Sequence, residues 1–330
     1  MRSTPSLRAP HEARVTKAAS IGQSINGPAR ARLVISSLIA IATAQPSVLA
    51  QTRSAPLDSL RTAVAARITQ TPGAIVGVFF VDLQNGNRLS LNADSVFHAA
   101  STMKIPVMIE VLRRAEQGAF RLDQPILLIN SFRSLADGSP FSLDARDDSD
   151  SSLYLRVGQR IPVAELMRLM ITRSSNLATN ILIELVGATH VTAGAHALGA
   201  TRTQVLRGVE DQKAFDAGLI NTITAADLGD LLAQIENGRV LSPSSSAMMR
   251  DILLAQEFNE KIPAGLPAGT RVAHKTGEIT AVSHDAAIVY PSVRKPYVLV
   301  VLTRGITDGK VSATLIADVS RLVYTFAIAH

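Results

Sequence analysis

The sequence predicts an α/β (α+β) fold, in which an antiparallel sheet of about five strands, formed by both chain ends, accompanies an inserted all-α domain. Strand-like segments are confined to residues 74–91 and 271–303. The residues between them, from about 102 to 260, have apolar side chains at helical spacing instead. Because isolated strands cannot bury their apolar faces, we expect the two terminal groups to pair in one sheet.

The first expected elements are a helix and a hairpin. Residues 57–70 place apolar side chains at helical spacing and end before Thr71-Pro72-Gly73. The apolar run 74–83 is strand-like, and Asn85-Gly86-Asn87 is a turn signal that leads to a second strand at 88–91. This order predicts a helix followed by two antiparallel strands.

The remaining elements follow from the same periodicities. Helices are expected at 107–116, 163–172, 177–186, 225–235 and 244–254, and strands at 271–274, 286–290 and 297–303. Residues 131–153, rich in Ser and Asp, predict a loop or a solvated insertion. A last helix at 311–327 has one apolar face, so the terminal helices are expected to cover the sheet.

These elements predict three regions. Residues 1–50 form a leader, residues 51–100 and 262–330 form the sheet domain, and residues 101–261 form the inserted helical domain. A groove between two such domains is the usual place for a small-molecule site.

Composition excludes several classes of function. Hydrophobic residues make up 47% of the 330 residues, which indicates a globular protein rather than a disordered one. The net charge of +6 comes mostly from residues 1–50, and the rest of the chain holds 27 basic and 26 acidic residues. With no Trp and 4% aromatic residues, we expect no nucleic-acid partner. The absence of cysteine excludes disulfides, thiolate metal sites and a Cys nucleophile.

The first fifty residues resemble an export signal. Arg30 and Arg32 precede an apolar run at 33–42, and small residues follow, with a cleavage point expected near Ala50-Gln51. The run is shorter than the roughly 20 residues of a membrane-spanning helix. The prediction is a periplasmic or secreted protein; the alternatives are an N-terminal membrane anchor or a disordered extension.

One Ser-Lys pair is a candidate for nucleophilic catalysis. In Ser101-Thr102-Met103-Lys104, at the start of a helical segment, the two side chains lie about one turn apart on one face. A serine hydroxyl becomes a good nucleophile when a nearby base takes its proton, and a lysine can do so if its pKa is lowered. Ser292 and Lys295 have the same spacing, but they lie between two predicted strands, where a solvated turn is expected.

Two further motifs follow along the chain. Ser174-Ser175-Asn176 lies between two helical segments, where Ser175 could instead be only an N-cap. Lys275-Thr276-Gly277 ends a predicted strand, where Gly277 would let a substrate approach the backbone. The alternative for this second motif is a strand end with an exposed lysine.

The order Ser-x-x-Lys, Ser-x-Asn, Lys-Thr-Gly resembles the serine β-lactamase and penicillin-binding protein superfamily, and most nearly the class A β-lactamases. The resemblance covers roughly residues 55–328. It implies a sheet domain with an all-α domain, which agrees with the order of elements. It also implies an enzyme that opens β-lactam amides through an acyl-enzyme, the chemistry of β-lactam antibiotic resistance.

The resemblance implies a role for each motif residue. Ser101 would be the acylated nucleophile, Lys104 its hydrogen-bonded partner and base, and Ser174 the proton donor to the leaving nitrogen. Glu210 would activate the deacylating water; the alternative is an exposed loop acid. The remaining motif positions would bind substrate: Asn176 its amide, Lys275, Thr276 and Gly277 its carboxylate region, and Glu278, with Ser101, the oxyanion through backbone N–H groups.

The sequence departs from the class A pattern at three positions. Ala214 replaces the family's asparagine four residues after the loop glutamate, Ser175 is the middle residue of its motif, and Glu278 stands where a small residue is usual. An acid at position 278 would repel an anionic substrate. The alternatives are therefore a peptidoglycan peptidase or esterase of the same superfamily, or a β-lactam-binding sensor that is acylated without turnover.

Other constellations are weaker. His284-Asp285 would suit a Ser-His-Asp hydrolase, but no Gly-x-Ser-x-Gly motif accompanies it. His190 and His196 are six residues apart, so they do not share a helix face for zinc. We expect no metal and no other cofactor, a small-molecule substrate and a monomeric enzyme.

Overall fold

The computed structural model describes residues 48–330, with side chains from Ala55 onward. The first helix, α1 (Val48–Thr69), begins nine residues earlier than the sequence predicted and contains Pro56. Most of the predicted leader lies outside the described residues. Its expected cleavage point, Ala50-Gln51, falls in the first turn of α1.

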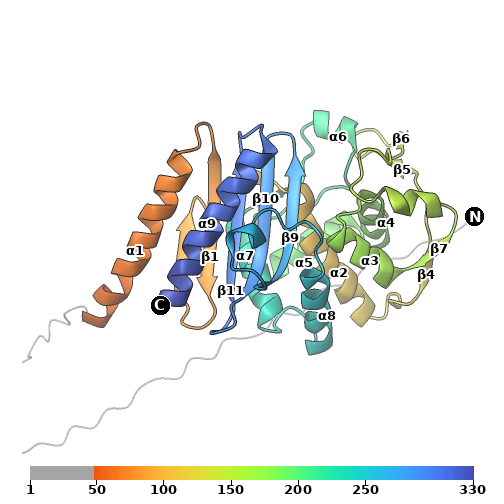
Figure 1. Ribbon diagram of the computed structural model, residues 1–330. Coiled ribbons are helices and arrows are strands. Elements are labelled where there is room, and N and C mark those ends of the chain that lie inside the picture. The colour runs from red at the N-terminus through yellow and green to blue at the C-terminus, as the bar shows by residue number, and fades with distance from the viewer. Residues whose placement is uncertain (1–47) are drawn as a thin grey trace, which may run out of the picture. The chain divides into compact units, whose positions relative to one another are not determined.

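The central element is a five-stranded antiparallel sheet with the order β2-β1-β11-β10-β9 (Figure 1). Its strands are β1 (Ile75–Asp82), β2 (Arg88–Leu91), β9 (Arg271–Ile279), β10 (Val282–Tyr290) and β11 (Tyr297–Arg304). Strands from both chain ends are therefore neighbours, since β1 pairs with β11 along its whole length. This arrangement confirms the predicted fold class.

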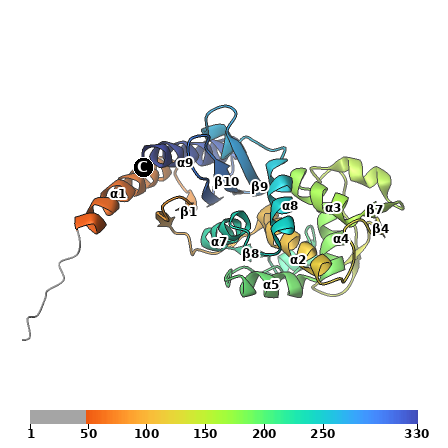
Figure 2. The ribbon, with the colours of Figure 1, turned by 90° about the horizontal axis from the view of Figure 1, so that it is seen from below.

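Helices α1 and α9 (Gly309–Ala329) cover one face of the sheet (Figures 1 and 2). Along β1, Val76, Val78 and Phe80 pack toward these helices, whereas Phe79 and Val81 belong to the core on the opposite face. This alternation follows from the two-residue period of a strand. Helix α9 is long and apolar enough to cross a membrane, but half of its most apolar 18-residue stretch is buried in the protein, as in a core helix.

The opposite face of the sheet packs against the helical region (Figure 2). Helices α7 and α8 lie next to the sheet, and α2 to α5 lie beyond them. The α-helices are α2 (Lys104–Glu116), α3 (Val163–Thr172), α4 (Asn176–Val186), α5 (Ala188–Ala197), α6 (Gln212–Asp216), α7 (Ala225–Glu236) and α8 (Pro243–Leu254). The five helices predicted in this region are confirmed, each within three residues at its ends.

Short elements complete the structure. The paired strands are β3 (Phe97–His98) with β8 (Thr222–Ile223), β4 (Pro125–Leu127) with β7 (Arg160–Pro162), and β5 (Phe132–Arg133) with β6 (Pro140–Phe141). The 3₁₀ turns are η1 (Ala100–Met103), η2 (Ser151–Arg156) and η3 (Pro263–Gly265).

The Ser- and Asp-rich segment 131–153 differs from the prediction of a solvated insertion. It is mostly loop, but Ser134, Asp148 and Asp150 are buried. Asp148 accepts hydrogen bonds from the backbone N–H groups of Asn176 and Leu177, at 2.9 and 3.0 Å. The segment is therefore fastened to the first turn of α4, where a carboxylate stabilises the N-terminal end of the helix.

Candidate active site

Ser101 lies in the 3₁₀ turn η1, directly before α2, and Lys104 is the first residue of that helix. In a 3₁₀ turn, side chains at positions i and i+3 lie on the same side, so Ser101 and Lys104 share one face. Ala100, before the serine, has a positive φ of 44°. A non-glycine residue in this conformation is strained by about 1–3 kcal/mol, and such strain is concentrated at functional sites.

The three sequence motifs meet at the hydroxyl of Ser174. Its Oγ lies 3.1 Å from Nζ of Lys104 and 3.0 Å from Nζ of Lys275. Ser174 has a positive φ of 58°, which places it at a sharp turn between α3 and α4. Ser175 caps α4 by accepting a hydrogen bond from the N–H of Ala178, as the alternative interpretation expected for that residue. Segments 70 and 101 residues away along the chain thus converge on one hydroxyl group.

Lys104 is a buried lysine with a lowered pKa. Its side chain has no solvent exposure, and this burial lowers the pKa to about 7, although Asp148 and Glu210 act in the opposite direction. A substantial fraction of the Lys104 amines is therefore neutral near pH 7 and able to accept a proton.

The expected hydrogen bond between Ser101 and Lys104 is not present in this structure. Nζ of Lys104 instead donates to the backbone O of Ser174 (2.6 Å), to Oγ of Ser174 and to Oδ1 of Asn176 (2.9 Å). An ammonium group has three donors, and these acceptors engage all three. Proton transfer from Ser101 requires the neutral amine, which has a free lone pair.

Lys275 is buried as completely as Lys104, so the alternative of an exposed strand-end lysine is wrong. Burial lowers its pKa well below the ordinary lysine value, and the neighbouring Lys104 and Lys261 act in the same direction. The whole Lys275-Thr276-Gly277 motif lies within β9, which is five residues longer than predicted. The strand continues past the motif because it pairs with β10 through Ile279.

Gly277 brings β9 against the turn that carries Ser101. A Cβ atom at this position would lie 3.0 Å from the backbone N of Ser101 and 3.1 Å from that of Thr102. A side chain would therefore force the strand away from the turn. Because Gly277 has no side chain, the backbone of β9 can lie directly beside that of Ser101.

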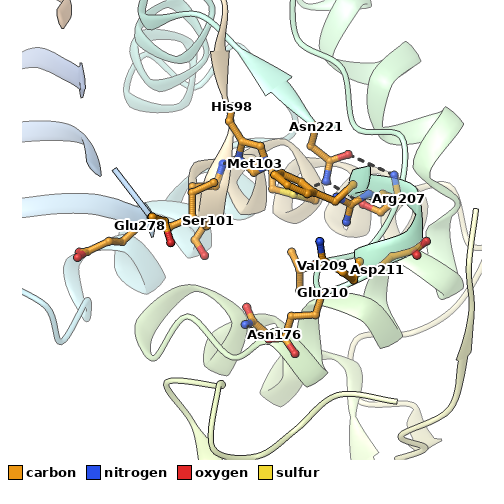
Figure 3. Close-up of a pocket in the computed structure, with 15 residues that line it drawn as sticks. His98, Ser101, Met103, Asn176, Arg207, Val209, Glu210, Asp211, Asn221 and Glu278 are labelled. Atoms are coloured by element: carbon orange, nitrogen blue, oxygen red, sulfur yellow. Dashed lines mark hydrogen bonds between the residues drawn. The ribbon is translucent and has the colours of Figure 1, made fainter. Parts of the chain in front are cut away.

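Glu210 lies on a loop that the backbone closes between Gln204 and Thr222, and we call residues 205–221 the Glu210 loop. Glu210 has a positive φ of 60°, and its Oε1 accepts a hydrogen bond of 2.5 Å from Nδ2 of Asn176 (Figure 3). Partial burial raises its pKa, although the side chain retains solvent exposure. Asn176 consequently links Glu210 to Lys104.

Glu278 extends away from Ser101 (Figure 3). Its Oε2 lies 3.1 Å from Nζ of Lys261, a lysine whose side chain is 2% exposed. The acid at this position is thus paired with a buried cation, which reduces the repulsion of an anionic substrate that the sequence suggested. Ala214, the other departure from the class A pattern, is fully buried in α6.

These residues surround a cavity of about 400 Å³, within the range of small-molecule sites. Four of the nine predicted site residues line it: Ser101, Asn176, Glu210 and Glu278. Lys104, Ser174 and Lys275 are buried and do not line the cavity. Lys104 donates a hydrogen bond to Asn176 in the lining, and Ser174 accepts hydrogen bonds from both lysines.

Sequence reasoning missed several residues that position the site. Asp148 holds Asn176 by its N–H and also accepts a hydrogen bond of 2.9 Å from the hydroxyl of Tyr154. Asn180 fastens the Glu210 loop through both backbone groups of Val209 (2.7 and 3.0 Å). Asn180 lies one helical turn after Asn176 on α4, so the sequence could have placed the two side chains on the same helix face. No comparable spacing marks Asp148 or Lys261.

The weaker constellations do not form sites. His284 is buried, its pKa is lowered to about 4 by burial, and its Nε2 lies 2.8 Å from the carbonyl O of His98. Asp285 contacts His274 instead. Within residues 48–330, no group of three His, Asp or Glu side chains is placed to hold a metal ion.

Comparisons with known proteins agree with this geometry. A model of the β-lactamase enzyme family matches residues 59–327. The carbapenem-hydrolyzing β-lactamase KPC of Klebsiella oxytoca is 30% identical, over 78% of this chain and 85% of its own length. Two solved structures each share 28% identity and a TM-score of 0.71 and cover 83% of this chain and 98% of their own: a PBP-A variant in an acyl-enzyme complex with penicillin-G, and a β-lactamase from Sphaerobacter thermophilus. The predicted relationship is confirmed, and the chain belongs to the β-lactamase enzyme family.

Proposed function

We propose that this protein is a serine β-lactamase that opens β-lactam amides through an acyl-enzyme on Ser101. The observation that carries the proposal is the position of Ser174 Oγ, which lies within 3.1 Å of the buried amines of Lys104 and Lys275. Lys104 is in turn one 3₁₀ turn after the proposed nucleophile, Ser101. Such an arrangement suits proton transfer, because each lysine is buried and has a lowered pKa.

Acylation begins with neutral Lys104. Its Nζ takes the proton of Ser101, and Oγ of Ser101 forms a bond to the lactam carbonyl carbon. Backbone N–H groups of Ser101 and Glu278 stabilise the oxyanion. The amide C–N bond then breaks, and Ser174 passes a proton, replaced from Lys104, to the leaving nitrogen. Atoms and charge balance without any cofactor.

Substrate binding is assigned to the groups around these steps. Asn176 meets the acyl amide, since its side chain lines the cavity between Lys104 and Glu210. Lys275 and Thr276 form the region for the substrate carboxylate, and Gly277 keeps the strand backbone close to Ser101. These roles rest on motif position together with the contacts described above.

Deacylation is assigned to Glu210, acting as the base for a water molecule. Its raised pKa suits a general base, and the loop is anchored by Asn180. Two observations favour slow turnover: Ala214 offers no polar group to hold that water, and Oε1 of Glu210 is engaged by Asn176. The second candidate function is therefore a β-lactam-binding protein that is acylated and rarely hydrolysed; a peptidoglycan peptidase or esterase is the third.

We also propose that the mature chain is exported, by the leader ending near Ala50-Gln51, to the periplasm or the medium. A monomer without metal or other cofactor suffices for the reaction, because each assigned group comes from one chain.

The test is incubation of the purified chain with a chromogenic cephalosporin and, separately, with a fluorescent penicillin. Turnover of the cephalosporin over many equivalents supports the β-lactamase. Stoichiometric labelling without turnover favours the binding protein. If the protein is not labelled and does not turn over the cephalosporin, the proposal that it forms an acyl-enzyme with β-lactams is contradicted.

A further inference from the structure

The cavity beside Ser101 extends under the Glu210 loop, and its far part holds a buried cation. This part is lined by His98, Arg207 and Asn221 (Figure 3). Phe215 also lines it. None of these four belongs to the motifs that carry the proposed reaction.

Arg207 is 92% buried, with a relative exposure of 8%. Its Nε donates to the carbonyl of Leu219 (2.8 Å) and its Nη1 to the carbonyl of Gly208 (2.9 Å). Within the described residues the guanidinium forms no ion pair, and its Nη2 donates no hydrogen bond. Arg207 lines the cavity, and its Nη2 is not among the fully sealed side-chain atoms that lack a hydrogen-bond partner, so this nitrogen keeps some exposed surface for a further acceptor.

The facing residue does not neutralise this charge. Asn221 carries an amide, and its Oδ1 accepts hydrogen bonds from the backbone N–H groups of Leu206 and Arg207 (2.8 and 3.3 Å). Its Nδ2 donates to the backbone O of Arg207. The Asn221 side chain is therefore engaged by the backbone of the loop and leaves the guanidinium free.

The acids that line the same cavity already have donors. Glu210 is bonded by Asn176, and Glu278 pairs with Lys261 outside the cavity. Asp211 is the carboxylate whose charge acts on the pKa of Arg207. It already accepts hydrogen bonds from the Ser134 hydroxyl and from the backbone N–H groups of Leu135 and Ala214. Arg207 is thus a cation with spare donors in a cavity whose carboxylates are otherwise satisfied.

We infer that Arg207 is a specificity residue that binds a carboxylate on the acyl side chain of the substrate. The side chain of an acyl group on Ser101 would pass Asn176 and extend under the Glu210 loop. There it would lie against Phe215 and His98, whose rings are 6.0 Å apart, with its anionic group at Nη2 of Arg207. A guanidinium is suited to this task, because it holds carboxylates through paired hydrogen bonds.

This inference rests on the proposed function, and the test separates the two. Benzylpenicillin and carbenicillin differ by one side-chain carboxylate, so the ratio of their second-order acylation rates, measured by competition with a fluorescent penicillin, isolates that group. In the parent chain we expect carbenicillin to react about tenfold faster, as for one charge-assisted contact. Arg207→Gln should reduce this ratio to about one, and Arg207→Lys should retain part of it.

A ratio taken within one protein is independent of the folded fraction, so a loosened loop in Arg207→Gln does not obscure the result. Lys213→Gln is the matched control, because it removes an exposed cation from the same loop, and it should leave the ratio unchanged. Equal loss of both rates in Arg207→Gln overturns the inference, since Arg207 would then only fasten the loop, while the proposed function stands. Failure of both penicillins to acylate the parent contradicts the proposed function itself.

Discussion

Replacing Glu210 by Gln should lower the pKa of Lys104 and shift the pH profile of acylation. The two groups are joined through the Asn176 side chain, with contacts of 2.9 Å to Lys104 and 2.5 Å to Glu210. Since the O and N atoms of an amide are about 2.3 Å apart, Nζ and Oε1 are separated by at most about 8 Å. At that distance two charges interact by about 2 kcal/mol with an effective dielectric constant of 20 and by about 0.5 kcal/mol in water.

The sign follows from the charge that is removed. The Glu210 carboxylate favours the ammonium form of Lys104, so its loss lowers the pKa of Lys104 from about 7. Because Glu210 is solvent-exposed, the screened end of the range applies more closely, and we expect a decrease of about 0.5–1 unit. Acylation rises with pH as Lys104 loses its proton, so its midpoint should move to lower pH while the plateau rate is retained.

The assay is the second-order rate of labelling by a fluorescent penicillin between pH 5 and 9. Glu210→Gln should also trap the acyl-enzyme as a stable mass adduct, because Gln cannot accept a proton from water. Glu257→Gln, the same change at an exposed acid paired with Arg173, serves as the control and should leave the midpoint in place. A midpoint in Glu210→Gln that stays constant within 0.2 units, or rises, would refute the reasoning that Lys104 is the base under the influence of Glu210.

Three further predictions concern the surrounding groups. Lys275→Ala should slow acylation by at least about 100-fold in the same labelling assay, and a change within twofold would reduce the motif to a structural strand. Asp148→Ala should lower the free energy of unfolding by about 2–3 kcal/mol in urea, because four donors lose their acceptor, whereas Tyr154→Phe should lower it by about 1 kcal/mol; equal effects would contradict this account. Glu278→Ser should speed acylation by anionic penicillins about threefold, because the change removes the partner of Lys261 and leaves its charge to attract the anion. If the same gain is found when Lys261 is also changed to Met, the charge of Lys261 is not its cause.

The sheet and the main helices could be predicted because their apolar periodicity is a local property. β1 and α3 show it most clearly, since each lies within one residue of the expected range. Helix α5 was missed because it consists largely of Ala, Gly, Thr and His, and α6 because it is five residues long. Neither sequence provides the apolar stripe on which the helical prediction depends.

The candidate site was predictable only as far as its motifs extend. The spacing of Ser101 and Lys104 follows from a turn, but the contact between Ser174 and Lys275 joins residues 101 positions apart and needs the fold. Asp148 and Lys261 lie in segments without periodicity, and their burial comes from partners far along the chain. The role of a charged residue in such a segment therefore depends on contacts that the local sequence does not encode.

The central claim, that Ser101 is the acylated nucleophile, is tested most directly by intact-mass analysis after reaction with benzylpenicillin, followed by peptide mapping. The account predicts one covalent adduct per chain, located on Ser101 and absent from Ser101→Ala. An adduct that persists in Ser101→Ala, or that maps to Ser174 or Ser292, would contradict it.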